Sequence, residues 1–323
     1  MLIATPNPCL DITIRIPRLQ PGTVGRATAT DTSAGGKGVN VARAAVALGG
    51  APAVAGFLPT QDGATLTTLL AAEAITFHPV TVDGVLRVAS ILLEDDGRVT
   101  VINGLGAQID AQHWDQFTTM VAARVATAQV LICSGSLPPG VAQDGYRQLV
   151  DIGHRAGVPV IVDAAPTVLR EALKSAPDLV SPNLSEAEGL LSGSLDEQVH
   201  EEGDDIPDRA LQAAVALHAA GAVRAVVTAG AAGAALSTDD GTWWLPAKPV
   251  DVVNPIGAGD CFAAGAGLAL TAGASDVDIV RRGMATASAS CETATAGRLD
   301  RLRADQLFRA IEADQVDTKT AKR

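Results

Sequence analysis

The stretch VLICSGSLPPGVAQDGYRQLVDIGHRAGVPVIVDA, residues 130–164, shows the alternation of strand and helix signals that recurs along the chain. It begins with a short aliphatic run at 130–135 and ends with another at 158–164, and a helix-length segment at 142–156 separates the two. Both runs end in turn or polar residues, which is typical of buried strands in a parallel sheet. The stretch therefore predicts a strand–helix–strand unit.

The same alternation continues along most of the chain. It predicts an α/β fold with a doubly wound, mostly parallel sheet flanked by helices. Ligands of such sheets bind beyond the carboxyl ends of the strands, so functional residues are expected there. Further strands are expected at 2–5, 53–57, 178–183 and 223–230, and further helices at 37–48, 62–73, 110–126 and 208–220.

Two insertions, 11–32 and 85–104, break the alternation because β-branched residues recur there at every second position. They predict a small antiparallel β-lid, which must cover either the active site or a second copy of itself. We expect one domain over 1–314 that includes this lid. Segment 196–208 carries seven acids and is expected to be a solvated surface loop, and 315–323 is expected to be a disordered tail.

The composition limits the possible partners. Hydrophobic residues make up 47% and aromatic residues 3% of the 323 residues, and the formal net charge is -12. Nucleic acids and acidic membranes need clustered Lys and Arg, so neither is expected as a partner, whereas an anionic small molecule stays possible in a local basic pocket. The four cysteines lack metal-site spacing, and neither a signal peptide nor a membrane span is apparent, so we expect a cytoplasmic protein with free thiols.

The segment SAGGKGVNVARAAVALGG, residues 33–50, places a glycine cluster before an amphipathic helix. It is not a Walker A loop because Gly38 follows Lys37, and it lacks the third glycine of a dinucleotide fingerprint. Its exposed backbone at a helix N-terminus, with Lys37 and Asn40 beside it, favours an oxygen-rich or anionic ligand. A tight structural turn is the alternative.

The segment NPIGAGD, residues 254–260, predicts a second such site. The N–H groups of Ala258, Gly259 and Asp260 can point at one anion in front of a helix dipole. Asp260 could act only as the helix cap. However, a simple cap needs neither Gly257 nor Gly259, and the following helix is almost uncharged, so we favour a general base beside an anion site.

These two segments resemble the signatures of the ribokinase / phosphofructokinase-B (PfkB) sugar kinases. The motifs between them occur in the order of that family, so the resemblance extends to about residue 300: NPCLD at 7–11, SGSLPPG at 134–140, PNLSE at 182–186 and VTAGAAGA at 227–234.

The resemblance implies an ATP-dependent kinase with a ribokinase-like fold. It implies that Asp260 is the base that deprotonates the acceptor hydroxyl, and that Gly257, Ala258 and Gly259 form the anion hole. ATP and Mg²⁺ are the implied cofactors, with a K⁺ requirement left open, and a homodimer through the β-lid is the implied assembly. The implied nucleotide-binding residues are Asn183, Thr228, Gly230, Gly233 and Ala287, and Asn183 and Glu186 would organise the metal through water.

The segments NVAR, SGSLPPG and VNP are closest to the branch of 1-phosphofructokinase and tagatose-6-phosphate kinase. This branch converts a ketohexose phosphate (fructose 1-phosphate, tagatose 6-phosphate or fructose 6-phosphate) to a bisphosphate. The cationic side chains would bind the sugar phosphate. The full set of implied substrate-binding residues is Asp11, Arg26, Gly35, Gly36, Lys37, Asn40, Arg87 and Ser136.

The chain departs from this branch near Arg87, where Leu86 and Ala89 replace polar residues, and at Ser181 and Cys261, where Lys and Ser are usual. Two alternatives therefore stay open. One is a kinase of an unphosphorylated sugar or a nucleoside, and the other is an inactive member that binds sugar or nucleotide as a sensor.

Overall fold

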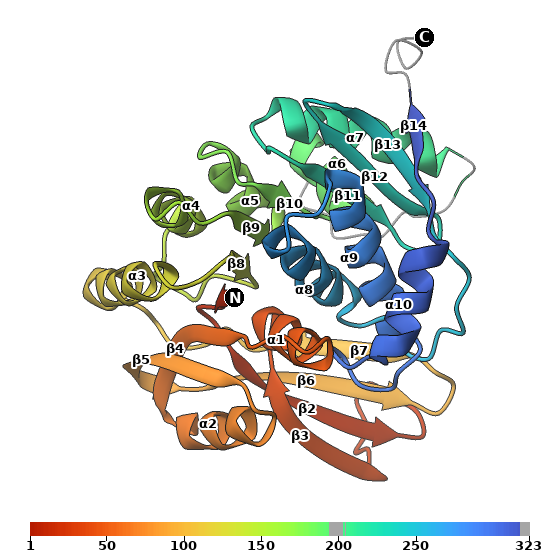
Figure 1. The fold of residues 1–323 in the computed structure, drawn as a ribbon. Helices are drawn as coiled ribbons and strands as arrows, with labels where there is room; N and C mark the ends of the chain where they lie inside the picture. Colours follow the sequence, from red (N-terminus) through yellow and green to blue (C-terminus); the bar gives the residue numbers. More distant parts are fainter. Residues whose placement is uncertain (194–202, 204, 317–323) are drawn as a thin grey trace.

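A ten-stranded sheet forms the centre of the molecule in the computed structural model, which describes residues 1–193, 203 and 205–316 (Figure 1). Its strands are β1 (Leu2–Ala4), β4 (Ala53–Gln61), β5 (Thr76–Val85), β8 (Leu131–Ser134), β9 (Val160–Asp163), β10 (Leu179–Val180), β11 (Ala225–Ala229), β12 (Gly233–Thr238), β13 (Gly241–Pro246) and β14 (Asp314–Val316). The order is β14-β13-β12-β11-β10-β9-β8-β1-β4-β5. The strands from β11 to β5 are parallel, and β12, β13 and β14 extend the sheet antiparallel.

Helices cover both faces of this sheet, so the predicted doubly wound α/β fold is confirmed. Alternate residues of each strand enter opposite cores: Leu131 and Cys133 join one, and Ile132 joins the other. The first core contains α3 (Ala111–Val125), α4 (Gly145–Arg155), α5 (Pro166–Leu173), α6 (Leu184–Ser192) and α7 (Ile206–Ala219). The second contains α1 (Lys37–Ala47), α2 (Gly63–Ala72), α8 (Ala258–Thr271), α9 (Asp276–Cys291) and α10 (Arg301–Ala310).

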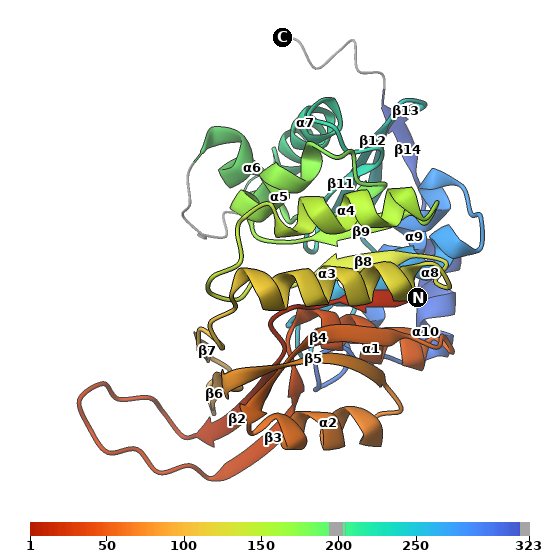
Figure 2. The same cartoon turned by 90° about the vertical axis from the view of Figure 1, so that its left-hand side faces the viewer.

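The lid is a separate four-stranded sheet in the order β3-β2-β6-β7. It consists of β2 (Cys9–Ile16), β3 (Ala29–Gly35), β6 (Arg87–Glu94) and β7 (Val99–Asn103). The pairs β2–β3 and β6–β7 are antiparallel, but β2 and β6 run parallel, so the expectation of a purely antiparallel lid is wrong. The central pair joins two insertions that the main sheet separates, and it is therefore not a hairpin. Figure 2 shows the loop between β2 and β3 projecting away from the body.

The C-terminal expectation also needs correction. The strand β14 pairs with β13, so Gln315 and Val316, which were assigned to a disordered tail, belong to the main sheet. Two other parts of these expectations lie outside the described residues. They are residues 317–323 of the tail, and residues 196–202 and 204 of the acidic loop. None of the described helices is long and apolar enough to span a membrane.

Helices α8 and α9 approach closely because glycines lie at their contact. A Cβ atom on Gly265 of α8 would lie 2.7 Å from the carbonyl oxygen of Arg282, and one on Gly283 of α9 would lie 2.6 Å from the ring of Phe262. Phe262 is itself buried and lines the cavity described below. The glycines therefore fix the position of the helix that carries Asp260.

We predict that Gly265→Ala lowers the free energy of unfolding by about 1–3 kcal/mol, because the added methyl group meets backbone that cannot move aside. Urea denaturation followed by circular dichroism measures this loss. Gly25→Ala is the control, since nothing lies within 4 Å of a Cβ atom there. Equal stability of the two variants would show that α8 and α9 can separate without cost.

Candidate active site

A cavity of about 1210 Å³ lies at the carboxyl end of the parallel strands. Thr5, Gly135 and Ser181 in its wall directly follow β1, β8 and β10. It extends from the lid strands β6 and β7 to the turn between β11 and β12. Most of the residues expected at the site line it, namely Asp11, Gly36, Lys37, Asn40, Arg87, Ser136, Asn183, Glu186, Thr228, Gly230, Gly233, Gly257, Ala258, Gly259, Asp260 and Ala287.

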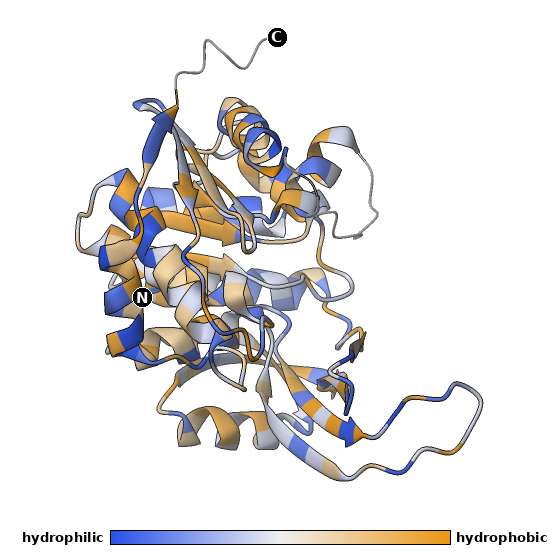
Figure 3. Ribbon diagram, turned by 90° about the vertical axis from the view of Figure 1, so that its right-hand side faces the viewer, coloured by the Kyte–Doolittle hydropathy of each residue, from blue (hydrophilic) through white to orange (hydrophobic). Residues whose placement is uncertain are grey.

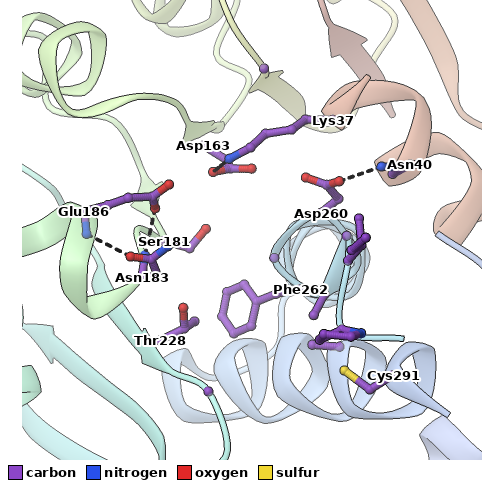
Figure 4. Close-up of a pocket in the computed structure, with 18 of the residues that line it drawn as sticks. Lys37, Asn40, Asp163, Ser181, Asn183, Glu186, Thr228, Asp260, Phe262 and Cys291 are labelled. Atoms are coloured by element: carbon purple, nitrogen blue, oxygen red, sulfur yellow. Dashed lines mark hydrogen bonds and ion pairs between the residues drawn. The ribbon is translucent and has the colours of Figure 1, made fainter. Parts of the chain in front are cut away.

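Asp260 lies in the middle of this cavity and does not cap its own helix. The helix α8 follows Gly257, whose φ is 81°, and no side chain caps its N-terminus. Instead, Asp260 Oδ2 accepts a hydrogen bond from Asn40 Nδ2 at 2.8 Å (Figure 4). The geometry excludes the interpretation of Asp260 as a simple helix cap.

The environment of Asp260 brings its titration to neutral pH. The side chain is buried, and this burial raises the pKa of Asp260 to about 7. The charge of Lys37 lowers the pKa and the charge of Asp163 raises it, with smaller effects from Asn40, which lowers it, and Asp11, which raises it. A carboxyl group with this pKa is suited to general-base chemistry at pH 7.

The backbone at the start of α8 offers free donors, although not the expected set. The N–H of Ala258 donates to the carbonyl oxygen of Pro255 at 3.2 Å, so it is not available to an anion. Among the described residues, the N–H groups of Gly257, Gly259 and Asp260 have no acceptor. These three N–H groups at a helix N-terminus can bind an anion.

Lys37 forms an ion pair with a residue from another element, which no local sequence pattern indicates. Its Nζ donates to Asp163 Oδ1 at 3.2 Å, and the charge of Asp163 is the main cause that raises the pKa of Lys37. Asp163 is the last residue of β9, where its position at the carboxyl end of a buried strand was the available sequence signal. Lys37 was expected to bind a sugar phosphate, but its ammonium group instead faces the acids at the centre of the cavity (Figure 4).

The lid end of the cavity combines a carboxylate with a fixed arginine. A Cβ atom on Gly35 would overlap the Asp11 carboxyl group, which explains why glycine stands at this position although it does not itself line the cavity. The Cys9 thiol donates to Asp11 Oδ1 at 3.3 Å. Arg87 Nε donates to the carbonyl oxygen of Gly104 at 2.9 Å, and its Nη1 lies 3.3 Å from Ser136 Oγ.

Arg26 is the one expected substrate ligand that lies apart from the others. It is exposed in the loop between β2 and β3, and it is not among the residues that line the cavity. Arg26 and Arg87 were both expected to bind the sugar phosphate. Within one copy of this chain, Arg87 lines the cavity and Arg26 does not.

At the opposite end, Asn183 and Glu186 hold each other in a capping box at the start of α6. Asn183 Oδ1 accepts from the N–H of Glu186 at 2.8 Å, and Glu186 Oε2 accepts from the N–H of Asn183 at 2.9 Å. The motif therefore has a complete structural role. Thr228, Gly230 and Ala287 line the same end of the cavity.

The oxygen donors near this end fit a hard cation that keeps part of its water shell. Among the described residues, the buried Asp163 Oδ2 and Ser181 Oγ have no hydrogen-bond partner. No cluster of three or more His, Cys, Asp or Glu side chains could enclose a metal ion in the described part of the chain. Mg²⁺ is commonly bound through few carboxylates, water and substrate phosphates, and this donor set suits it.

Residues 4–300 of the chain match the pfkB family of carbohydrate kinases. The chain belongs to this family. It is 36% identical over 289 residues to a 1-phosphofructokinase of Haloferax volcanii, which covers 89% of the chain and 90% of the relative. It is 32% identical over 264 residues to a 1-phosphofructokinase of Haemophilus influenzae, covering 81% of each.

The fold of this pfkB kinase also matches solved structures. Phosphofructokinase-2 from Escherichia coli in complex with potassium superimposes with a TM-score of 0.86 at 27% identity, covering 96% of the chain and 98% of that structure. The family and branch expected from the sequence motifs are therefore confirmed, and the chain is a sugar kinase.

Proposed function

We propose that this pfkB kinase transfers the γ-phosphoryl group of ATP to a hydroxyl group of a ketohexose phosphate and so forms a bisphosphate. The position of Asp260 carries the proposal. It is a buried carboxylate that caps no helix, lies between the two ends of one cavity, and stands beside three backbone N–H groups without acceptors. The names of the two relatives favour fructose 1-phosphate as the acceptor.

The acceptor sugar would lie at the lid end. Asp11 offers a carboxylate to its hydroxyl groups, and Arg87 with Ser136 offers donors to its phosphate. Arg87 is well suited because backbone and side-chain oxygens hold its guanidinium group in place, with Asn103 Oδ1 at 2.9 Å and the carbonyl oxygen of Asn7 at 3.3 Å. An immobilised guanidinium loses little side-chain entropy when it binds phosphate.

Each residue near Asp260 has a defined role in the proposed transfer. Asp260 takes the proton of the acceptor hydroxyl as that oxygen bonds to the γ-phosphorus, and the bond to the β,γ-bridging oxygen breaks so that ADP leaves. The N–H groups of Gly257, Gly259 and Asp260 stabilise the charge on the transferred group. Lys37 adds a positive charge to the same region. Asn183 and Glu186 would hold Mg²⁺ through water, and the ion would neutralise the triphosphate.

Replacing the base tests this assignment. Asp260→Asn keeps the shape of the side chain but cannot accept a proton, so we expect kcat to fall by about 10²–10⁴-fold. ADP release with MgATP and fructose 1-phosphate measures the loss. Unchanged circular dichroism and ATP binding would show that the variant is folded. Wild-type turnover by this variant would refute the role of Asp260.

Arg87→Ala tests the sugar phosphate. We expect kcat/KM to fall about 10–100-fold with fructose 1-phosphate, tagatose 6-phosphate or fructose 6-phosphate, because charged hydrogen bonds are lost. Any turnover of fructose, ribose or adenosine should change little. Arg98→Ala is the control, since Arg98 lies in the same lid but pairs with Glu94 outside the cavity. Equal losses with phosphorylated and neutral acceptors would make Arg87 structural.

We further propose that two copies associate through the lid and that Arg26 completes the partner's cavity. Its loop projects from the body with hydrophobic and hydrophilic residues mixed along it (Figure 3), Val24 is 93% exposed, and Ile102 of β7 is 61% exposed. Both side chains belong to the lid segments, and exposed apolar side chains are typical of interaction surfaces.

Complementation between two variants tests this arrangement. Arg26→Ala and Asp260→Asn should each be weakly active, and co-expression should restore activity, because a mixed dimer has one site with both Asp260 and the Arg26 of the other copy. Kinase assays on the purified mixture measure the recovery. Sedimentation as a monomer, or no recovery in proven mixed dimers, would exclude the proposal.

A further inference from the structure

Hydrogen bonds link four side chains in a row, from Glu73 through Arg43 and Asn40 of α1 to Asp260. Arg43 on α1 donates through Nη2 to Glu73 Oε1 at 2.8 Å and through Nε to the other oxygen of Glu73. Its Nη1 donates to Asn40 Oδ1 at 2.9 Å. Asn40 Nδ2 then donates to Asp260 Oδ2 at 2.8 Å. Arg43 lines no part of the cavity.

The chemistry of the donors fixes the direction of this chain. A guanidinium group can only donate, so Asn40 must turn its carbonyl oxygen toward Arg43. The amide nitrogen of Asn40 then necessarily faces Asp260, which can accept its hydrogen bond. Asp260 Oδ2 is thereby engaged, and Oδ1 is the oxygen left for an acceptor hydroxyl.

The surroundings hold Asn40 and Arg43 from several sides. Arg43 also donates to the carbonyl oxygens of Ala34 at 2.9 Å and Ala296 at 3.0 Å. A Cβ atom on Gly297 would lie 2.9 Å from the carbonyl oxygen of Asn40. Arg43 thus joins the end of β3 to the segment after α9, and this segment adjoins the start of α8, since a Cβ atom on Gly257 would lie 3.2 Å from that of Ala296.

We infer that Arg43 is a positioning residue of the transfer reaction, which acts through Asn40 to orient the Asp260 carboxylate. The inference rests on the proposed role of Asp260 as the base. Glu73 pairs with the buried guanidinium, whose side chain is only 8% exposed, and the charges that chiefly shift the pKa of Asp260 are those of Lys37, Asp163 and Asp11, so Arg43 acts on Asp260 mainly through geometry.

The other groups that face Asp260 come from different elements. They are Lys37 of α1, Asp163 of β9 and Asp11 of β2. None of these makes a hydrogen bond with Arg43 in the described part of the chain. The charge of Arg43 also lowers the pKa of Asp11, but Arg43→Lys keeps that charge, so the effect of this variant reaches Asp260 by way of Asn40.

The decisive variant is Arg43→Lys. It keeps the charge, but a single ammonium group cannot reproduce the planar arrangement of donors that binds Glu73 and Asn40 together. Asn40 is then free to turn, and Asp260 loses a hydrogen bond that stabilises its charged form. We expect kcat at pH 7 to fall about 10-fold while KM for both substrates stays within about twofold. The pKa of Asp260 rises, so the acid limb of the kcat–pH profile moves up by about one pH unit.

Arg281→Lys is the matched control. Arg281 also donates to one carboxylate and two carbonyl oxygens, those of Asp278, Ile311 and Phe308, but it joins α9 to α10 away from Asp260. We expect it to lower stability with no shift of the kcat–pH profile. An equal shift in both variants would reduce the effect of Arg43 to general destabilisation and overturn the inference.

A double-mutant cycle with Asn40→Ala separates the remaining outcomes. If Arg43 acts through Asn40, Arg43→Lys lowers kcat little further once Asn40 is alanine. Additive losses would overturn the inference. A profile unchanged by Arg43→Lys would overturn it too, and an inactive Asp260→Asn would then show that the proposed function still stands. If Asp260→Asn is fully active, the base assignment itself fails.

Discussion

The burial of one carboxylate, that of Asp260, is the constraint to which the rest of the site responds. Burial alone would keep this group neutral, and a neutral carboxylic acid cannot accept a proton. Lys37 and the amide of Asn40 restore part of the charged form, whereas Asp163 and Asp11 oppose it. The balance of these effects brings the pKa of Asp260 to about 7, which suits the proposed role as a base near neutral pH.

Backbone packing sets the positions of these groups. Gly257, which precedes α8, adopts the left-handed backbone conformation that favours glycine, and Gly35 leaves room for the Asp11 carboxyl group. Gly265 and Gly283 bring α8 against α9, which fixes the helix that carries Asp260. Each of these glycines is needed because a side chain there would collide with a neighbouring group or require an unfavourable backbone conformation.

Much of the fold could be predicted from the sequence because its signals are local. The aliphatic runs at 130–135 and 158–164 became β8 and β9, and the intervening segment became α4. The pairing of β2 with β6 could not be predicted, since it joins residues about 80 positions apart and no turn specifies it. The expectation that Ala258 donates to an anion failed for a local reason, because the turn before α8 directs the N–H of Ala258 to the carbonyl oxygen of Pro255.

Within the site, individual residues could be identified from the sequence, but their partnerships could not. The Lys37–Asp163 pair spans 126 positions and the Asn40–Asp260 bond spans 220, so neither leaves a local pattern. Asn183 and Glu186 show why a structural and a functional interpretation need not compete. The hydrogen bonds that cap α6 also fix the Glu186 carboxyl group in the cavity wall, so the cap is what positions the acid. Asp260 is the opposite case, because its helix begins without a side-chain cap and the carboxylate is held from another element. An acid at a helix start is thus assigned by where its oxygens bond, and Asp260 Oδ2 bonds to Asn40 of α1 rather than to the backbone of its own helix.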